Sequence, residues 1–349
     1  MPDFVKAGYW ICGSRYFTRS VKDLPSELFT HLYAGFAEVN ANDGRVTVPE
    51  KYEDQFRNFT NTVRERSHGV KTLLSIGGEG SHISTVVADP NKRQAFIRTS
   101  IDLASDFHFD GLDLCWLYPN SPTDNPENLK LLLEEWRRTA TDSLLLTAAV
   151  YHHPVIPPSP IQEGNNVNFN YPCQAISENL DWINVLSIDF YTPSKSPGET
   201  GPVHGWRTRS TEPTKCGSHG IGSWINTEII HVQKLVLGLP FYGYKWILDN
   251  PNICESIFAL AHPATDTHPI SYRNIPPSPR KHNKYYVASY VQNEGSWYGF
   301  DDECDISTKV REAIVGRKLR GYSAWNVNGD DEKWTLSNAA YNAANAVNP

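Results

Sequence analysis

Short apolar segments rich in β-branched and aromatic residues recur along the chain, and most are separated by stretches long enough for a helix. This alternation is typical of parallel βα units. The segments that fit strands cover residues 4–10, 30–38, 71–77, 109–115, 144–150, 182–189, 234–240 and 321–325. Their continuous hydrophobicity, as in W-I-N-V-L at 182–186, indicates strands covered on both faces. Eight such strands with intervening helices predict a TIM (β/α)8 barrel of the α/β class.

The intervening stretches show helical periodicity, with one exception. Apolar residues at three-to-four spacing predict helices over 52–66, 91–106 and 126–141, and a last helix over 335–346. The long interval between Gly243 and a helix predicted at 306–316 contains a proline-rich stretch and a strand-like segment at 285–290. We therefore expect a small α+β insertion between the seventh and eighth strands. The expected domains are a barrel of residues 1–243 and 305–349 and an insertion of residues 244–304.

Ligand groups of a TIM barrel come from the carboxyl ends of the strands and the loops that follow them. That rule predicts one cleft, bordered by residues 77–78, 115–117 and 189–191, by Tyr242 and by Trp325. His152-His153-Pro154 follows the fifth strand, and these histidines are either ligand contacts or solvated loop residues.

Composition narrows the classes of partner. The 349 residues carry a net charge of -7, and no Lys/Arg-rich run occurs, which argues against nucleic acid and anionic membranes. No run approaches the roughly 18 apolar residues of a membrane span. No C-x-x-C or H-x-x-x-H spacing is present, so we expect neither a metal nor a cofactor. The ten tryptophans suit either a core or a sugar-binding surface.

Two features point to an extracellular or vacuolar protein. Asn58-Phe59-Thr60 is an N-x-S/T sequon, which predicts a glycosylated, secreted protein. No charged-then-apolar signal segment opens the chain, so we expect a mature form without its leader.

The six cysteines allow fifteen full pairings. Cys254 and Cys304 both fall in the expected insertion, and Cys173 and Cys216 flank the sixth strand, so each pair is a candidate disulfide. Cys115 is expected to point into the barrel interior as a small apolar thiol.

The run F-D-G-L-D-L-C-W-L-Y-P at 109–119 carries the strongest functional signal. It resembles the fourth-strand signature D-x-x-D-x-D-x-E of glycoside hydrolase family 18, the chitinase family. Asp110 and Asp113 match its first two aspartates, and we expect both to be structural. Cys115 stands where the resemblance implies the aspartate that orients the sugar's acetamido group. Leu117 stands where it implies the general acid.

Other segments resemble plant class V chitinases of the same family over nearly the whole chain. They are K-A-G-Y-W at 6–10, S-I-G-G at 75–78, G-L-P-F-Y-G at 238–243, W-Y-G-F-D-D at 297–302 and G-Y-S-A-W at 321–325. The family's sixth-strand pattern M-x-Y-D-x-Y is represented by L-S-I-D-F-Y, in which Ile188 replaces the first tyrosine. The resemblance thus implies that three polar groups of the sugar pocket are lost, which puts the N-acetylglucosamine preference in question.

A sugar site is nevertheless expected to survive in part. Its expected residues are Phe36, Gly78, Asp189, Tyr191, Tyr242 and Trp325. Phe36 at the end of the second strand and Trp246 after the seventh suit either the cleft or the core.

The resemblance implies a chitinase-like lectin without hydrolase activity, which binds an oligosaccharide or the glycans of a glycoprotein. A storage protein or a glycosidase inhibitor on the same barrel is the alternative. A residual chitinase that uses Asp113 or Glu79 as its acid is a third hypothesis. Agglutination requires at least two sites, from a homodimer or from a second site in each chain.

Overall fold

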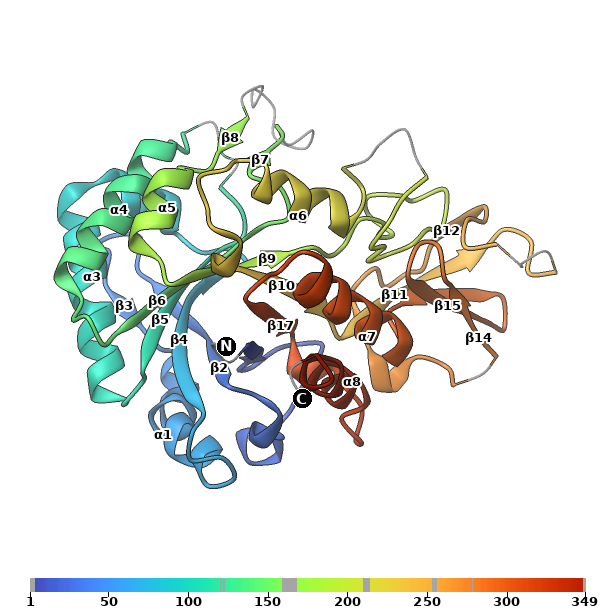
Figure 1. Cartoon of the computed structure of the whole chain (residues 1–349), viewed down its shortest axis with the longest axis horizontal. Coiled ribbons are helices and arrows are strands. Elements are labelled where there is room, and N and C mark those ends of the chain that lie inside the picture. The colour runs from blue at the N-terminus through green and yellow to red at the C-terminus, as the bar shows by residue number, and fades with distance from the viewer. Residues whose placement is uncertain are drawn as a thin grey trace.

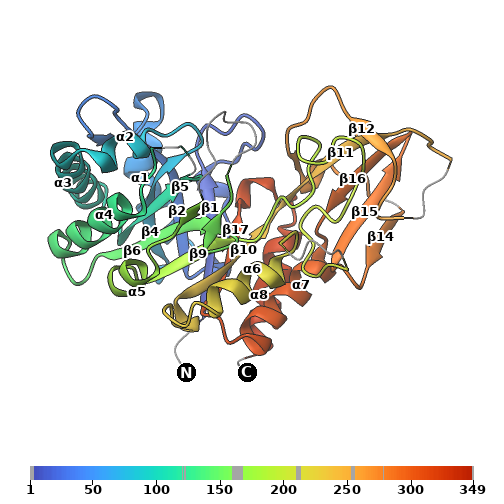
Figure 2. The ribbon, with the colours of Figure 1, turned by 90° about the horizontal axis from the view of Figure 1, so that it is seen from above.

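The computed structural model describes residues 4–119, 121, 123–158, 168–209, 214–252, 256–277 and 279–347. A barrel of strands and helices occupies one side of the molecule and an antiparallel sheet the other (Figures 1 and 2). The amino and carboxyl termini emerge on the same side (Figure 2). Among the described residues, no helix is long and apolar enough to cross a membrane.

In the described part of the chain, eight parallel strands close into the barrel. They are β1 (Val5–Ile11), β2 (His31–Val39), β4 (Lys71–Gly78), β5 (Gly111–Trp116), β6 (Leu145–Tyr151), β9 (Trp182–Leu186), β10 (Leu235–Pro240) and β17 (Gly321–Trp325). The order β1-β17-β10-β9-β6-β5-β4-β2 is closed by pairing of β1 with β2, and β3 (Val46–Thr47) adds to β2 antiparallel. Each strand overlaps a predicted segment, so the predicted TIM barrel is confirmed.

The sixth barrel strand is shorter than predicted. It ends at Leu186 rather than at Asp189, because the Ser187 amide donates to the Val185 carbonyl in a turn. Asp189 itself has a φ of 62°, a left-handed conformation that ends strand geometry. The segment 187–191 is therefore a loop at the barrel rim.

The predicted helices are present, and α3 and α4 begin with side-chain caps. Asp89 accepts hydrogen bonds from two amides at the start of α3, and Asn125 caps α4 with Pro126 in the first turn. The α-helices are α1 (Glu53–Arg64), α2 (Ile83–Ala88), α3 (Pro90–Asp106), α4 (Pro126–Thr139), α5 (Cys173–Asn179), α6 (Gly217–Ile225), α7 (Glu303–Arg311) and α8 (Thr335–Asn345). Short turns are η1 (Val21–Asp23), η2 (Ser26–Leu28), η3 (Glu50–Tyr52), η4 (Val232–Lys234), η5 (Tyr272–Asn274), the π-helical η6 (Glu312–Gly316) and η7 (Val327–Gly329). Strand β7 (Val155–Ile156) pairs antiparallel with β8 (Phe169–Asn170).

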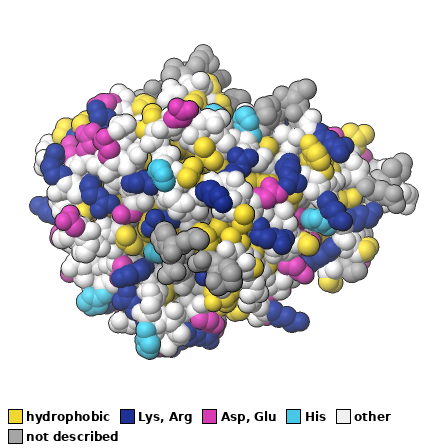
Figure 3. Space-filling model, viewed as in Figure 1, with side chains coloured by type: hydrophobic (Ala, Val, Ile, Leu, Met, Phe, Trp, Pro, Cys, Tyr) yellow, Lys and Arg dark blue, Asp and Glu magenta, His cyan; other side chains and the backbone are white. Residues whose placement is uncertain are grey.

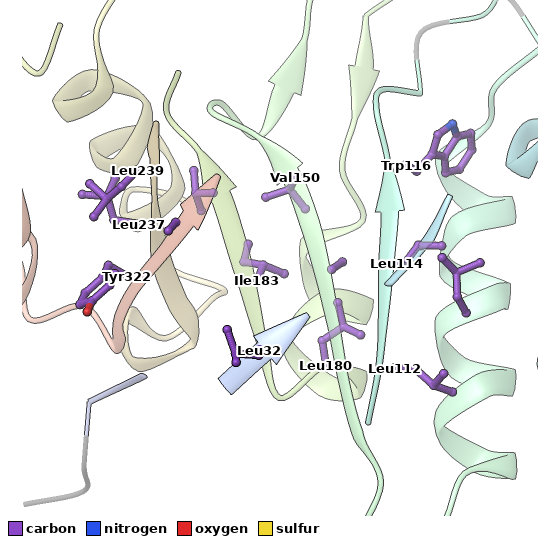
Figure 4. Packing of buried hydrophobic residues seen from close by; sticks show 14 of the residues in the cluster. Leu32, Leu112, Leu114, Trp116, Val150, Leu180, Ile183, Leu237, Leu239 and Tyr322 are labelled. Carbon is purple, nitrogen blue, oxygen red and sulfur yellow. The ribbon is translucent and has the colours of Figure 1, made fainter. Parts of the chain in front are cut away.

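The core has two layers, separated by the barrel wall. Leu112, Leu114 and Trp116 project from β5 toward the neighbouring helix and belong to the outer cluster (Figure 4). Cys115 belongs to the inner cluster. Asp113, which lies between Leu112 and Leu114 in the sequence, is fully buried. Because successive side chains of a strand point to opposite faces, residues 113, 115 and 117 face the barrel interior. The catalytic-motif positions are thus on the inside, and Trp116 is on the outside.

The second sheet follows β10 directly in sequence. It contains β11 (Tyr242–Leu248), β12 (Ala261–Pro263), β13 (Ile270–Ser271), β14 (Arg280–Asn283), β15 (Ala288–Asn293) and β16 (Ser296–Phe300). Trp246 and Trp297 pack in its own apolar cluster. The strand predicted at 285–290 is displaced, because Asn283 Oδ1 accepts from the amides of Tyr285 and Tyr286 in a turn. The domain boundaries at 243/244 and 304/305 stay a prediction.

Candidate functional site

The end of β5 presents two side chains without a carboxylate to the barrel mouth. Cys115 pairs in register with Gly77 and Ala149 and is completely buried. Burial and the nearby Asp113 raise the pKa of its thiol well above the usual range, so the group stays uncharged. Leu117 is partly exposed and packs against the inner cluster. Neither side chain supplies a negative charge at the mouth.

Asp113 lies below these residues and is occupied by structural hydrogen bonds. Its carboxylate accepts from Tyr9 Oη at 3.0 Å, Ser75 Oγ at 2.7 Å and Thr147 Oγ1 at 2.7 Å. Desolvation raises the pKa of Asp113 to about 6, although these donors oppose the shift. The structural role expected for this residue is confirmed.

Asp110 is the first motif aspartate and directly precedes β5. It accepts from the Thr72 amide at 2.7 Å and pairs with Arg64 at 2.6 Å and with Lys71 at 3.3 Å. It therefore joins β4, β5 and α1, which confirms its expected structural role.

Aromatic side chains line the mouth opposite β5. Trp325, at the end of β17, is partly exposed and lies edge-on to Tyr9, with ring centroids 4.8 Å apart. Phe36 lies at an irregularity in β2 where the register shifts, and its ring centroid is 6.1 Å from that of Trp325. Gly78 has a φ of 79°, and a Cβ there would lie 2.6 Å from the Phe36 ring. The backbone of Gly78 thus makes room for Phe36.

A polar network supports this aromatic pair from below. Tyr9 stacks on Tyr33 at 4.2 Å, and Asn184 Nδ2 donates to both phenol oxygens. Trp182 Nε1 donates to Tyr33 Oη at 3.0 Å. The residues beneath Trp325 are therefore held by hydrogen bonds across three barrel strands.

Asp189 and Tyr242 lie together at the other side of the mouth. Tyr242 Oη donates to Asp189 Oδ1 at 2.9 Å, and Tyr244 also hydrogen-bonds to this carboxylate. Desolvation raises the pKa of Asp189, while the charge of Lys195 and the two phenols act in the opposite direction. The side chain keeps 27% of its surface exposed, so a ligand can reach it.

Other expected site residues occupy different surroundings. Ile188 is buried in the inner cluster. Tyr191 is also buried, and its ring lies edge-on to Phe258, next to the second sheet. Trp246 lies in the apolar core of the second sheet and not in the cleft. Sequence reasoning missed Tyr244, although its spacing of two from Tyr242 places both on one face of β11.

Two cavities lie near this end of the molecule. One, of about 450 Å³, is lined by residues that include His152, His153 and Asp189. Desolvation lowers the pKa of His152 to about 3 and also lowers that of His153, so both rings are neutral at pH 7. The other, of about 630 Å³, lies between the segment after β1 and helix α1, and Asn58 is among its lining residues. The single cleft expected around the mouth stays a prediction.

The expected local disulfide between Cys173 and Cys216 is absent. Cys173 is a partly buried free thiol at the first residue of α5, and Cys216 Sγ lies 3.7 Å from Ser218 Oγ before α6. Cys304 is an exposed free thiol, and Cys254 lies outside the described residues. The two helices that flank β9 thus place the paired candidates in separate environments.

One histidine–carboxylate group lies away from the mouth. Ligand atoms of His282, Asp302 and Asp305 are within 4.8 Å of one another. Asp302 and Asp305 form a capping box at the start of α7, and Asp305 also accepts from Ser289 Oγ at 2.6 Å. The carboxylates therefore have a structural role in fixing this helix.

Comparison with known proteins identifies the family. A family model described as glycosyl hydrolases family 18 matches residues 6–330. The chain belongs to glycosyl hydrolase family 18. Within family 18, it is 36% identical over 366 residues to a class V chitinase of Arabidopsis thaliana, which covers 98% of this chain and 90% of the relative.

Solved family 18 structures share the whole fold. A class V chitinase mutant from Nicotiana tobaccum in complex with NAG4 superposes with a TM-score of 0.87 at 35% identity, over 98% of this chain and 99% of that one. The chitinase-like agglutinin RobpsCRA from Robinia pseudoacacia superposes with a TM-score of 0.82 at 35% identity, over 97% and 99%. This family 18 chain is therefore similar both to chitinases and to an agglutinin.

Proposed function

We propose that this family 18 protein is a carbohydrate-binding, chitinase-like lectin without hydrolase activity. The observation that carries the proposal is the inward face of β5, where a buried thiol and a leucine follow Asp113. Family 18 enzymes use the substrate's acetamido group as the nucleophile, with a carboxylic acid as proton donor. General acid catalysis contributes about 10²–10⁴-fold and a fixed charge about 10²–10³-fold. Cys115 and Leu117 supply neither contribution.

Two nearby carboxylates, Asp113 and Asp189, are already engaged in hydrogen bonds. Asp113 is fully buried and already accepts three hydroxyl donors, so a glycosidic oxygen has no path to it. Asp189 is held by Tyr242 and Tyr244. Glu79 is exposed just after β4, and it is the acid on which the residual-chitinase hypothesis depends.

Sugar binding is supported by the aromatic residues that stay partly exposed at the mouth. Phe36 and Trp325 lie close together on one side and the Asp189 carboxylate on the other. Sugar rings have apolar C–H faces that pack on aromatic rings and hydroxyls that donate to carboxylates. Similarity to an agglutinin on the same fold adds support.

The decisive experiment combines a glycan array with a hydrolysis assay on NAG4. We expect binding to one or more oligosaccharides and no release of reducing ends above the buffer blank. Turnover by the wild type would refute the absence of hydrolysis. If turnover survives Glu79→Gln and is lost in Asp189→Asn, Asp189 is the acid, and the reverse result identifies Glu79. No binding on the array would favour a storage protein or glycosidase inhibitor instead.

The remaining expectations form part of the same proposal. The protein is secreted or vacuolar and glycosylated at Asn58, which lies exposed within α1. Agglutination by such a lectin needs two sites, from a homodimer or from one chain. Size-exclusion chromatography with light scattering distinguishes these two arrangements.

A further inference from the structure

The cavity between the segment after β1 and helix α1 has the dimensions of a ligand site. Its volume of about 630 Å³ lies within the range of about 300–1,000 Å³ for small-molecule sites. Gly13, Phe17 and Arg19 line it from the loop, and Tyr52 and Thr62 from the helix side. None of the mouth residues described above lines this cavity, so the two sites do not share a wall residue.

The loop wall of this cavity is fixed by hydrogen bonds. Trp10 Nε1 donates to the Arg19 carbonyl at 3.0 Å, and Asn328 Nδ2 donates to the Phe17 carbonyl at 3.3 Å. The Arg19 guanidinium pairs with Glu332 at 2.7 Å. A wall fixed in this way loses little conformational entropy when a ligand binds.

The lining chemistry suits a neutral polyhydroxylated ligand. The charged lining residues are Arg19, Lys22, Asp23 and Asp54, two of each sign. Tyr52 adds a half-buried aromatic ring, and a Cβ on Gly13 would lie 2.5 Å from that ring. The side chain of Arg19 is only 8% exposed, and its guanidinium donates to Glu332 and to the Asp330 carbonyl at 3.1 Å, so the charge of this lining residue is already paired.

We propose that this cavity is a second oligosaccharide-binding site. The proposal rests on the lectin function and extends it, because one chain then carries two sites, at the barrel mouth and beside α1. Two sites on one chain permit cross-linking without dimerisation. The Tyr52 ring supplies the stacking surface, and the polar side chains of the loop and of α1 bind hydroxyl groups.

An oligosaccharide in this cavity could come from two sources, because Asn58, the expected glycosylation site, lines the cavity. A free oligosaccharide binds from solution, whereas a glycan attached to Asn58 starts at the cavity wall. Protein made in bacteria has no N-glycan and leaves the cavity open to added sugar. Glycosylated protein, and its Asn58→Gln variant from the same eukaryotic host, show whether the attached glycan blocks the cavity.

The experiment is titration calorimetry of bacterially made full chain with NAG4 and with the N-glycan core pentasaccharide. For at least one probe we expect two sites per chain, one lost in Trp325→Ala and the other in Thr62→Trp. Thr62 lines the cavity, whereas its exposed helix neighbour Asn61 does not, so Asn61→Trp is the matched control and keeps both sites. Tyr52→Ala, which empties rather than fills the cavity, should weaken the second site about tenfold through loss of the ring.

The outcomes separate this inference from the lectin function. A single site that is lost in Trp325→Ala and unaffected by Thr62→Trp overturns the second site and leaves the lectin function intact. A single site lost only in Thr62→Trp supports the cavity and contradicts the mouth. No binding of either probe overturns both. Two sites in the bacterial protein and one in the glycosylated protein, restored by Asn58→Gln, identify the attached glycan as the occupant.

Discussion

Tyr242 Oη and Asp189 Oδ1 are joined by a 2.9 Å hydrogen bond that connects the first strand of the second sheet to the loop after β9. Asp189 also lines the 450 Å³ cavity, so this bond lies between the mouth and that cavity. It keeps a partly exposed carboxylate in place at a left-handed backbone position. Acidic and basic side chains are interspersed on the face shown in Figure 3, which is the face where the two termini emerge (Figure 2).

Replacing Tyr242 with phenylalanine removes this bond alone. The bond lowers the pKa of Asp189, so we expect the pKa to rise further in Tyr242→Phe. The loss should also reduce the free energy of unfolding by about 1–2 kcal/mol. Carboxyl NMR titration and urea unfolding measure the two effects. An unchanged Asp189 titration would contradict the assigned contact.

Restoring both motif carboxylates tests the proposed absence of hydrolase activity. In Leu117→Glu with Cys115→Asp, the new glutamate meets apolar neighbours, which raise the pKa of a carboxyl and suit it to proton donation. We expect NAG4 hydrolysis at least about 100-fold above the wild-type background. Leu117→Glu alone should remain well below the double variant, because nothing then orients the acetamido group. If the double variant stays inactive and gains activity only with Ile188→Tyr, the pocket shape and not the missing acid limits the reaction.

Burial of Asp113 predicts a pH-dependent stability. Its pKa rises from 3.8 to about 6 on folding, so the folded state binds the proton more tightly than the unfolded state. The resulting stabilisation is complete below pH 3.8 and is lost as the pH rises through 6. Relative to Asp113→Asn, the wild type should therefore lose up to about 3 kcal/mol of unfolding free energy between pH 4 and pH 7. Urea unfolding across this range tests it, and parallel pH curves would contradict it.

Two glycines, one at the end of β4 and one just after it, separate the effect of backbone strain from that of moving the Phe36 ring. Gly78 and Gly80 have φ values of 79° and 72°, but a Cβ meets the Phe36 ring only at Gly78 and open space at Gly80. Each alanine variant should lose about 1–2 kcal/mol from the left-handed conformation. Gly78→Ala alone should also move Phe36 and weaken sugar binding at the mouth. Equal loss of glycan affinity in both variants would exclude a role for Phe36.

Labelling of the thiols tests whether Cys173, Cys304 and Cys115 are free and how far each is exposed. Cys304 is exposed and Cys173 partly exposed, whereas Cys115 is fully buried. Without reductant, maleimide should label Cys304 and Cys173 in the native protein and Cys115 only after unfolding. Recovery of a peptide that joins Cys173 to Cys216 would contradict the structure.

Local sequence determined much of the fold. Continuous apolar segments gave all eight barrel strands, because parallel strands covered on both faces leave this pattern in any context. Proline and polar caps marked the starts of α3 and α4. The end of β9 and the position of β15 were missed, because single side-chain or backbone hydrogen bonds in turns decide them.

By itself, the sequence determined that Cys115 and Leu117 occupy a family 18 motif, and that β5 places them with Asp113 on one face. Only the tertiary structure decided that Trp116 faces outward, that Tyr191 lies beside Phe258, and that Asp189 contacts Tyr242. These contacts join strands far apart in the chain, and their geometry depends on how the barrel closes and the second sheet packs. The cavity beside α1 is likewise decided only by the tertiary structure, since its walls meet only after β1, the loop that follows β1 and α1 have packed together.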